Sequence, residues 1–203
     1  YLPIHEACQL GSRDDKVDTI EYMLGLYPEC LYARDRRGWL PIHGAAENGN
    51  TKTIELLLMH DPTAASKETT GEKRELPLHI ACRGVCGEHV DTVNALFDAY
   101  PEAVLTRNEN GWLPIHGAAE NGNTKTIELL LMYDPSAASK ETTGGGRSRC
   151  RLPLHIACLH LNGNTSAVQV LYDAYPEAIL TRNGNGETPI DLAEECGNSK
   201  VLS

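Results

Sequence analysis

A ten-residue stretch decides the fold, and it reads Leu40-Pro41-Ile42-His43-Gly44-Ala45-Ala46-Glu47-Asn48-Gly49. Proline is tolerated in the first turn of a helix, where its missing N–H is not needed. Ile42, Ala45 and Ala46 then recur at helical spacing and form one apolar face. Asn48-Gly49 is a helix stop signal. The stretch therefore predicts one short helix with a single apolar face.

A second helix follows within the same unit. Asn50 or Thr51 can cap its first turn, and Asp61-Pro62 ends it because proline cannot continue a helix. The apolar residues between these ends lie at helical spacing: Ile54, Leu57 and Leu58. Neither helix is long enough to be stable alone in water, so neighbouring units must stack to bury the shared apolar face.

The same unit recurs along the chain at intervals of 36 to 39 residues. Five units open with Leu-Pro and a truncated sixth opens with Thr-Pro, and they start at residues 2, 40, 76, 113, 152 and 188. Residues 38–71 match residues 111–144 except at His60/Tyr133 and Thr63/Ser136, which indicates duplication of a two-repeat block of 73 residues. We expect residues 1–203 to form a single repeat array.

This pattern resembles the ankyrin repeat, whose signature is Thr-Pro-Leu-His-x-Ala-Ala, a Gly between the helices and a hairpin with Asp-x-x-Gly. Asp35-Arg36-Arg37-Gly38 and Ala45-Ala46-Glu47-Asn48-Gly49 match that signature, and the resemblance covers essentially the whole chain. It implies an all-α solenoid of stacked helix-turn-helix units joined by β-hairpin-like loops. Five of the six units carry Leu where the family has Thr, which removes a side-chain cap and a hydroxyl partner for the following histidine.

Composition narrows the class of protein. A net charge of −10 argues against a nucleic-acid binder, and no apolar stretch approaches the roughly 20 residues that span a bilayer. The seven cysteines lack a disulfide-like spacing, which favours an intracellular, reducing compartment such as the cytoplasm or nucleus. No signal peptide is apparent. Tyr1 already lies inside a repeat motif, so the chain looks like a fragment, which leaves room for an upstream targeting segment.

Several patterns resemble chemical sites, and each coincides with a repeat position. His79, Cys82, Cys86 and His89 have a metal-like spacing, but His79 is the histidine of other units and Cys82 replaces a small alanine. Residues 44–53 superficially resemble a phosphate-binding loop but lack a lysine directly after the second glycine. No group of nucleophile and base is apparent. We expect no metal, no cofactor and no catalytic residue.

The cysteines divide into two kinds. Cys8, Cys82 and Cys158 occupy equivalent repeat positions, where we expect small buried side chains. Cys150 instead lies among arginines, whose positive charge favours the thiolate. Cys150 is the one cysteine that we expect a thiol reagent to reach.

The resemblance also implies where a partner binds, because ankyrin repeats usually grip their partners with the hairpin tips and the first helix of each unit. Three kinds of position qualify: the residue before each Leu-Pro or Thr-Pro turn, the tip residues, and the pair after two small residues. In that order, these positions are Trp39, Trp112 and Glu187, with Glu75 and Arg151 matching less closely because their hairpins are longer; Arg36, Arg37, Glu109 and Asn110; and Glu47, Asn48, Glu120 and Asn121.

The two tryptophans of the chain, Trp39 and Trp112, both occupy the hairpin position, one in each duplicated block. Tryptophan is enriched in interface hot spots, and helix packing distances of about 8–10 Å place the pair about 20 Å apart along the array. We expect them to grip a partner with a repeating or extended surface. The alternative is that each ring packs over its own hairpin as local core.

Charge gives an independent signal for the same loops. The hairpin windows 33–39, 66–75, 106–112, 139–151 and 181–187 hold 12 of the 18 Lys and Arg but only 7 of the 28 acidic residues. Their net charge is +5, against −15 for the rest of the chain. We therefore expect a protein partner with an acidic patch. The alternative, that loops simply carry solvated charge, does not account for the bias in sign.

These observations favour a non-enzymatic protein–protein interaction scaffold that binds a partner through hairpin tips and first helices. Two alternatives stay open. One is a structural spacer or assembly subunit within a larger complex, and the other is the regulatory ankyrin portion of a longer enzyme.

Overall fold

A computed structural model describes residues 3–9, 14–84, 89–144, 150–160 and 165–197. Within these ranges all regular structure is helical, and no strand is formed. The α-helices are α1 (Pro3–Gln9), α2 (Asp14–Leu26), α3 (Pro41–Glu47), α4 (Thr51–His60), α5 (Pro77–Arg83), α6 (Val90–Ala99), α7 (Pro114–Asn121), α8 (Thr124–Tyr133), α9 (Pro153–His160), α10 (Thr165–Ala174) and α11 (Pro189–Glu195). The all-α prediction is confirmed. The predicted start of the first unit, at residue 2, and Cys86 lie outside the described ranges.

A short 3₁₀ turn follows each complete helix pair, because a proline stops the second helix and starts the turn. These turns are η1 (Pro28–Tyr32), η2 (Pro62–Ser66), η3 (Pro101–Leu105), η4 (Pro135–Ser139) and η5 (Pro176–Leu180). They lead the chain from each second helix into the next hairpin.

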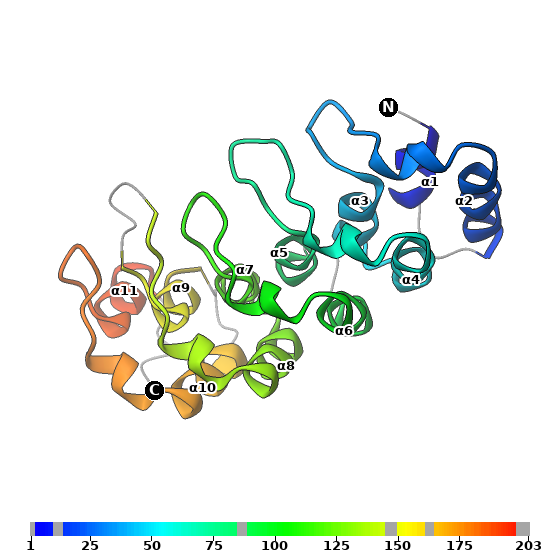
Figure 1. The fold of residues 1–203 in the computed structure, drawn as a ribbon. Helices are drawn as coiled ribbons and strands as arrows, with labels where there is room; N and C mark the ends of the chain where they lie inside the picture. Colours follow the sequence, from blue (N-terminus) through cyan, green and yellow to red (C-terminus); the bar gives the residue numbers. More distant parts are fainter. Residues whose placement is uncertain (1–2, 10–13, 85–88, 145–149, 161–164, 198–203) are drawn as a thin grey trace. The chain divides into compact units, whose positions relative to one another are not determined.

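The chain divides into two compact units, residues 1–103 and 104–203. In the first unit, α1, α3 and α5 pack side by side in one row, and α2, α4 and α6 form a second row alongside it (Figure 1). In the second unit, α7, α9 and α11 form the first row, and α8 packs against α10. No described helix combines the length and apolar character needed to cross a bilayer.

The core of each helix pair is built from small and branched side chains. Ala45 and Ala46 of α3 are fully buried, as are Ile54 and Leu57 of α4. Alanine lets neighbouring first helices approach closely, while the larger residues fill the space between the two rows. The expected apolar face of α4 packs at Ile54 and Leu57, but Leu58 is only half-buried and Leu56 is buried in addition.

In the described part of the chain, leucines that replace the family threonine precede the first helices of four units. Leu40 is only 3% exposed, so its side chain contributes to the core instead of capping the helix. Its backbone N–H donates to His43 Nδ1 at 3.0 Å, and the His43 N–H donates to the Leu40 carbonyl at 3.0 Å. His43 Nε2 then donates to the Lys67 carbonyl of the next hairpin at 2.9 Å. The polar network at this turn thus persists without the hydroxyl.

Thr188 in the last unit keeps the family residue and shows what the hydroxyl adds. Its Oγ1 accepts from the Asp191 N–H at 3.2 Å, and Asp191 Oδ2 accepts from the Thr188 N–H at 2.8 Å. This reciprocal cap satisfies two backbone donors at the start of α11.

Within each unit, the described parts of the hairpin loops project beyond the first helices (Figure 1). We call them fingers 1 to 5, for residues 33–39, 66–75, 106–112, 139–151 and 181–187. They join in pairs within a unit, because the Thr70 N–H donates to the Gly38 carbonyl at 3.1 Å and the Thr143 N–H donates to the Gly111 carbonyl at 3.2 Å. Fingers 1 and 2 thus form one pair, and fingers 3 and 4 form another.

Candidate protein-binding surface

Finger 1 holds Trp39 against its own unit. The Arg37 guanidinium lies 3.9 Å from the centroid of the Trp39 ring, and the centroid of the His43 ring lies 6.2 Å away. His5 of α1 donates from Nε2 to the Trp39 carbonyl oxygen at 2.9 Å. The tryptophan is half-buried. Its ring is therefore fixed by contacts within the chain and still presents part of its surface to solvent.

Arg37 connects the finger tip to the end of α3. It pairs with Asp35 Oδ2 at 3.3 Å and with Glu47 Oε2 at 3.6 Å. Burial alone would raise the pKa of Asp35, but backbone N–H donors of Trp39 and Arg37 and the Arg37 charge lower it overall. The structure thus brings together three of the residues predicted to bind a partner: Arg37, Trp39 and Glu47.

Finger 3 has the same backbone with different side chains at the tip. Asn108 Oδ1 accepts from the N–H of Asn110 and of Trp112, each at 3.0 Å, as Asp35 does in finger 1. The Trp112 ring lies 6.0 Å from the His116 ring, centroid to centroid. Asn110 stands where finger 1 has Arg37, so finger 3 lacks a guanidinium at that position. The residue two positions before the tryptophan therefore differs between the two fingers.

The other predicted positions differ in exposure. Those that are exposed are Arg36, Glu109, Asn110 and Asn121. Those that are half-buried are Asn48, Glu120, Arg151 and Glu187. Both asparagines at the ends of these first helices fold back on their own helix, since Asn48 Nδ2 donates to the Gly44 carbonyl at 2.9 Å and Asn121 Nδ2 to the Gly117 carbonyl at 3.3 Å.

Glu187 sits in a network on finger 5. Hydrogen bonds from the side chains of Asn183 and Asn185 lower the pKa of its carboxyl, and the charge of Arg151 adds to this effect. The Asn183 Nδ2 to Glu187 Oε2 distance is 3.0 Å. Arg151 of finger 4 and Glu187 of finger 5, both predicted site residues, thus interact electrostatically.

Glu75, one of the two candidates on the longer hairpins, is buried and paired within the chain. It is only 6% exposed, and Arg83 at the end of α5 pairs with its Oε1 at 2.6 Å. Sequence reasoning overlooked Arg83, although it follows two small residues, as Glu47 and Glu120 do. Applying the same positional rule to every unit would have found it.

Family models for ankyrin repeats match the chain over residues 4–106 and 65–144, for the three-copy model, and over residues 144–193, for the many-copy model. The chain belongs to the ankyrin-repeat family. Ankyrin repeats generally mediate protein binding and are not themselves catalytic. The expected resemblance is therefore confirmed.

Three similar proteins illustrate the range of ankyrin-repeat relatives. The tyrosine-protein kinase HTK16 of Hydra vulgaris is 24% identical over 85% of this chain and 21% of its own length. The target of rapamycin complex 2 subunit AVO2 of Saccharomyces cerevisiae is 28% identical over 90% of this chain and 42% of its own length. The human SH3 and multiple ankyrin repeat domains protein 2 is 25% identical over 98% of this chain and 10% of its own length. The chain therefore spans less than half of each of these relatives.

Part of the positive charge on these ankyrin fingers is neutralised within the chain. Arg37 pairs with Asp35 and Glu47, and Arg74 pairs with Glu68 at 3.1 Å. Among the described residues, the finger cations with no carboxylate within 4.0 Å include Arg34, Arg36, Lys67, Lys73, Arg107 and Lys140. The fingers thus keep unpaired positive charge, although less than the residue count suggests.

The described residues contain no group of three or more His, Cys, Asp or Glu side chains that could hold a metal ion. No disulfide joins any of the described cysteines, and Cys8, Cys82 and Cys158 are buried as expected. Cys196 is exposed, whereas Cys150 is half-buried. The expectation that a thiol reagent would reach Cys150 alone is therefore wrong, because Cys196 is the more exposed of the two.

Proposed function

We propose that this chain is a protein-binding scaffold that holds a partner with an acidic patch along its finger tips and first helices. The observation that carries the proposal is the cluster of Arg37, Trp39 and Glu47, which joins a finger tip to the end of a first helix. Tryptophan and arginine are the residues most enriched in interface hot spots. The whole set of positions predicted from the sequence, from Trp39 to Glu187, belongs to this proposal.

The fixed position of Trp39 supports a role in binding. Arg37, His43 and the backbone contact from His5 restrict the ring before any partner arrives. Ordering a side chain on binding costs about 0.5–1.5 kcal/mol, so a ring that is already restricted loses less. These contacts with its own hairpin hold the ring in place for a partner. Packing over the hairpin, which the sequence analysis gave as the alternative to binding, is therefore compatible with it.

Unpaired finger cations support an acidic partner. Arg36 at the tip of finger 1 and Lys73 on finger 2 are exposed, and neither forms an ion pair within 4.0 Å with a described carboxylate. Charges at the rim of an interface mainly raise the association rate and weaken with salt. We therefore expect the association rate with the partner to fall as ionic strength rises.

The test is an affinity pull-down from the native source with the wild type and with the double variant Trp39→Ala/Trp112→Ala. We expect the double variant to retain about a tenth or less of the partner, since truncating a hot-spot residue costs about 2 kcal/mol or more. Tyr22→Ala, which removes an exposed aromatic ring on α2, is the matched control. Equal recovery by the double variant and the wild type, with both folded, would sink the proposal.

The relatives favour a second candidate, in which this chain is one part of a larger protein or complex. AVO2 is named as a subunit of a complex and HTK16 as a kinase, and both are much longer than the region matched here. Hydrogen exchange in the native complex separates the two candidates. Protection confined to fingers and first helices supports the scaffold, whereas protection that also covers α4 and α8 supports an assembly subunit.

A further inference from the structure

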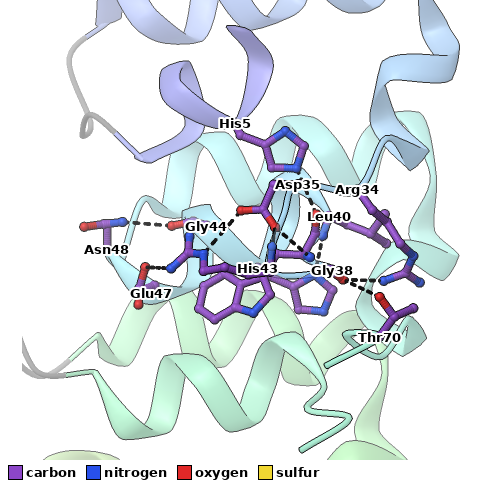
Figure 2. A network of polar contacts seen from close by, with 12 residues as sticks. His5, Arg34, Asp35, Gly38, Leu40, His43, Gly44, Glu47, Asn48 and Thr70 are labelled. Atoms are coloured by element: carbon purple, nitrogen blue, oxygen red, sulfur yellow. Dashed lines mark hydrogen bonds and ion pairs between the residues drawn. The ribbon is translucent and has the colours of Figure 1, made fainter. Parts of the chain in front are cut away.

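A polar pocket of about 500 Å³ lies between fingers 1 and 2, apart from the tryptophan cluster. The lining residues that matter here are Arg34, Lys67, Glu68, Thr70 and Arg74. Figure 2 shows Arg34 and Thr70 beyond Gly38 at the right, while Glu47 and Asn48 lie at the left. Different side chains therefore form this pocket and the proposed protein-binding cluster.

Arg34 is held in place by backbone carbonyls. Its Nη1 donates to the Gly38 carbonyl at 2.7 Å and to the Glu68 carbonyl at 3.0 Å. A guanidinium has five N–H donors in a rigid fork, and Nε and Nη2 of Arg34 donate to no described residue. Carbonyl oxygens orient the group without cancelling its charge. The Arg34 guanidinium is thus fixed in position, keeps its charge and has N–H donors left for a ligand.

The charges of the pocket do not cancel. Arg74 and Glu68 pair at 3.1 Å and neutralise each other. Arg34 and Lys67 have no described carboxylate within ion-pair distance. Asp61 senses the charge of Lys67 but does not line the pocket, and its Oδ1 accepts from the N–H and hydroxyl of Thr63. The lining residues therefore carry a net charge of +2.

We propose that this pocket binds the phosphate dianion of a phosphorylated serine or threonine in a protein partner. A phosphorylated side chain carries a charge of about −1.5 to −2 and three strong acceptor oxygens. It therefore matches the net +2 of the lining and the donors of Arg34 and Lys67, whereas a carboxylate leaves one charge uncompensated.

The exposure of the pocket favours a phosphate carried on a chain. Sites for free small molecules usually enclose most of the ligand with apolar walls. Here Arg34, Lys67, Thr70 and Arg74 are all exposed, so the pocket covers one face of its ligand only. A phosphoryl group attached to a partner protein can bind in such an open pocket, because the partner itself covers its other side.

The duplication repeats the same residues in the second unit. Arg107, Lys140, Glu141 and Thr143 stand where the first unit has Arg34, Lys67, Glu68 and Thr70. Arg107 Nη1 again donates to the carbonyl of its finger glycine, Gly111, at 2.7 Å. We therefore expect a second site of the same chemistry between fingers 3 and 4.

The proposal can be tested by following backbone amide NMR signals of the full chain. The probes are an acetylated and amidated Ala-Ala-phosphoserine-Ala-Ala peptide, its versions with serine and with glutamate, and inorganic phosphate. We expect saturable shifts at the Lys67–Thr70 amides with the phosphopeptide and none with the serine peptide. Lys67→Gln should weaken phosphopeptide binding at these amides about fivefold, as expected for loss of one partly solvated charge pair.

Lys52→Gln is the matched control, because Lys52 is an exposed lysine of the same unit, on α4, that does not line the pocket. Unchanged binding in this variant supports the assignment to the pocket. Equal weakening by both substitutions would show a general charge effect and overturn it. The proposal also fails if the glutamate peptide binds as tightly as the phosphopeptide, or if only inorganic phosphate binds. None of these results bears on the tryptophan cluster, which is tested separately by the pull-down.

Discussion

His43 shows how a single buried side chain connects a helix start to a finger. Both ring nitrogens are used, since Nδ1 accepts from the Leu40 N–H and Nε2 donates to the Lys67 carbonyl. This arrangement requires a neutral ring with its proton on Nε2. Burial lowers the pKa of His43 to about 4. A proton added at Nδ1 would face the Leu40 N–H and break the bond between them.

Stability should therefore fall as the solution becomes mildly acidic. The pKa of an unfolded histidine is about 6.5. Between pH 6.5 and 4, His43 is therefore protonated in the unfolded chain but stays neutral in the folded protein. The free energy of unfolding should drop by about 3 kcal/mol across this window for His43 alone. His155, whose pKa is also lowered by burial, acts in the same direction. Urea unfolding midpoints from pH 7.5 to 4.5 measure the slope.

A control comes from the exposed His60 of α4. His60→Gln should leave the dependence on pH unchanged, since that ring is solvated in both states. A free energy of unfolding that stays flat from pH 7 to 4.5 in the wild type would contradict the proposed role of the buried histidines.

At the scale of elements, the sequence already predicts the helices closely. It places the first helix of the second unit between Pro41 and Asn48-Gly49, and α3 runs from Pro41 to Glu47. It places the second between Asn50 or Thr51 and Asp61-Pro62, and α4 runs from Thr51 to His60. Proline and glycine fix these ends through local backbone chemistry, which a sequence shows directly.

The contacts between elements were harder to predict. Arg37 meets Glu47, and Glu75 meets Arg83, because each finger folds back over the end of a first helix. No spacing rule gives that geometry. The role of Leu40 was also missed, since sequence reasoning counted the lost hydroxyl and not the buried side chain that replaced it. The 3₁₀ turns were overlooked because the proline was read only as a helix end.

The two finger pairs should differ in their tolerance of an added methyl group. A Cβ on Gly144 would overlap the backbone carbonyl of Asn110, whereas a Cβ on Gly71 would lie 3.5 Å from the Arg37 carbonyl oxygen. Gly144→Ala should therefore lower the free energy of unfolding by about 1–3 kcal/mol, as overpacking does elsewhere. Gly71→Ala, the same change in the other pair, should be close to neutral. Thermal unfolding of both variants would refute this asymmetry if they melted together.

At the scale of the whole molecule, the sequence predicts that residues 1–203 act as one array. The chain forms two compact units, each with its own rows of helices. In repeat proteins, stability is close to a sum of repeat terms and nearest-neighbour terms, so adjoining repeats tend to unfold together. We therefore retain the single array as a prediction.

Each unit contains one tryptophan, which makes the prediction measurable. Trp112→Phe leaves Trp39 as a reporter for the first unit, and Trp39→Phe leaves Trp112 for the second. If the chain is one cooperative array, urea unfolding followed by fluorescence should coincide with unfolding followed by circular dichroism in both variants. Well-separated fluorescence midpoints in the two variants, each with an unchanged dichroism midpoint, would instead show two independent units.

The bond that joins each finger pair has an evolutionary consequence. It connects a backbone N–H to a backbone carbonyl, Thr70 to Gly38 in one block and Thr143 to Gly111 in the other. Selection on recognition can therefore rewrite tip side chains without disturbing the bond between the fingers. The two blocks already show such divergence, since Arg36-Arg37 in one has become Glu109-Asn110 in the other while residues 38–59 and 111–132 are identical. Duplication of this block therefore yields another folded finger pair whose tip side chains, and with them its binding specificity, can change in later evolution.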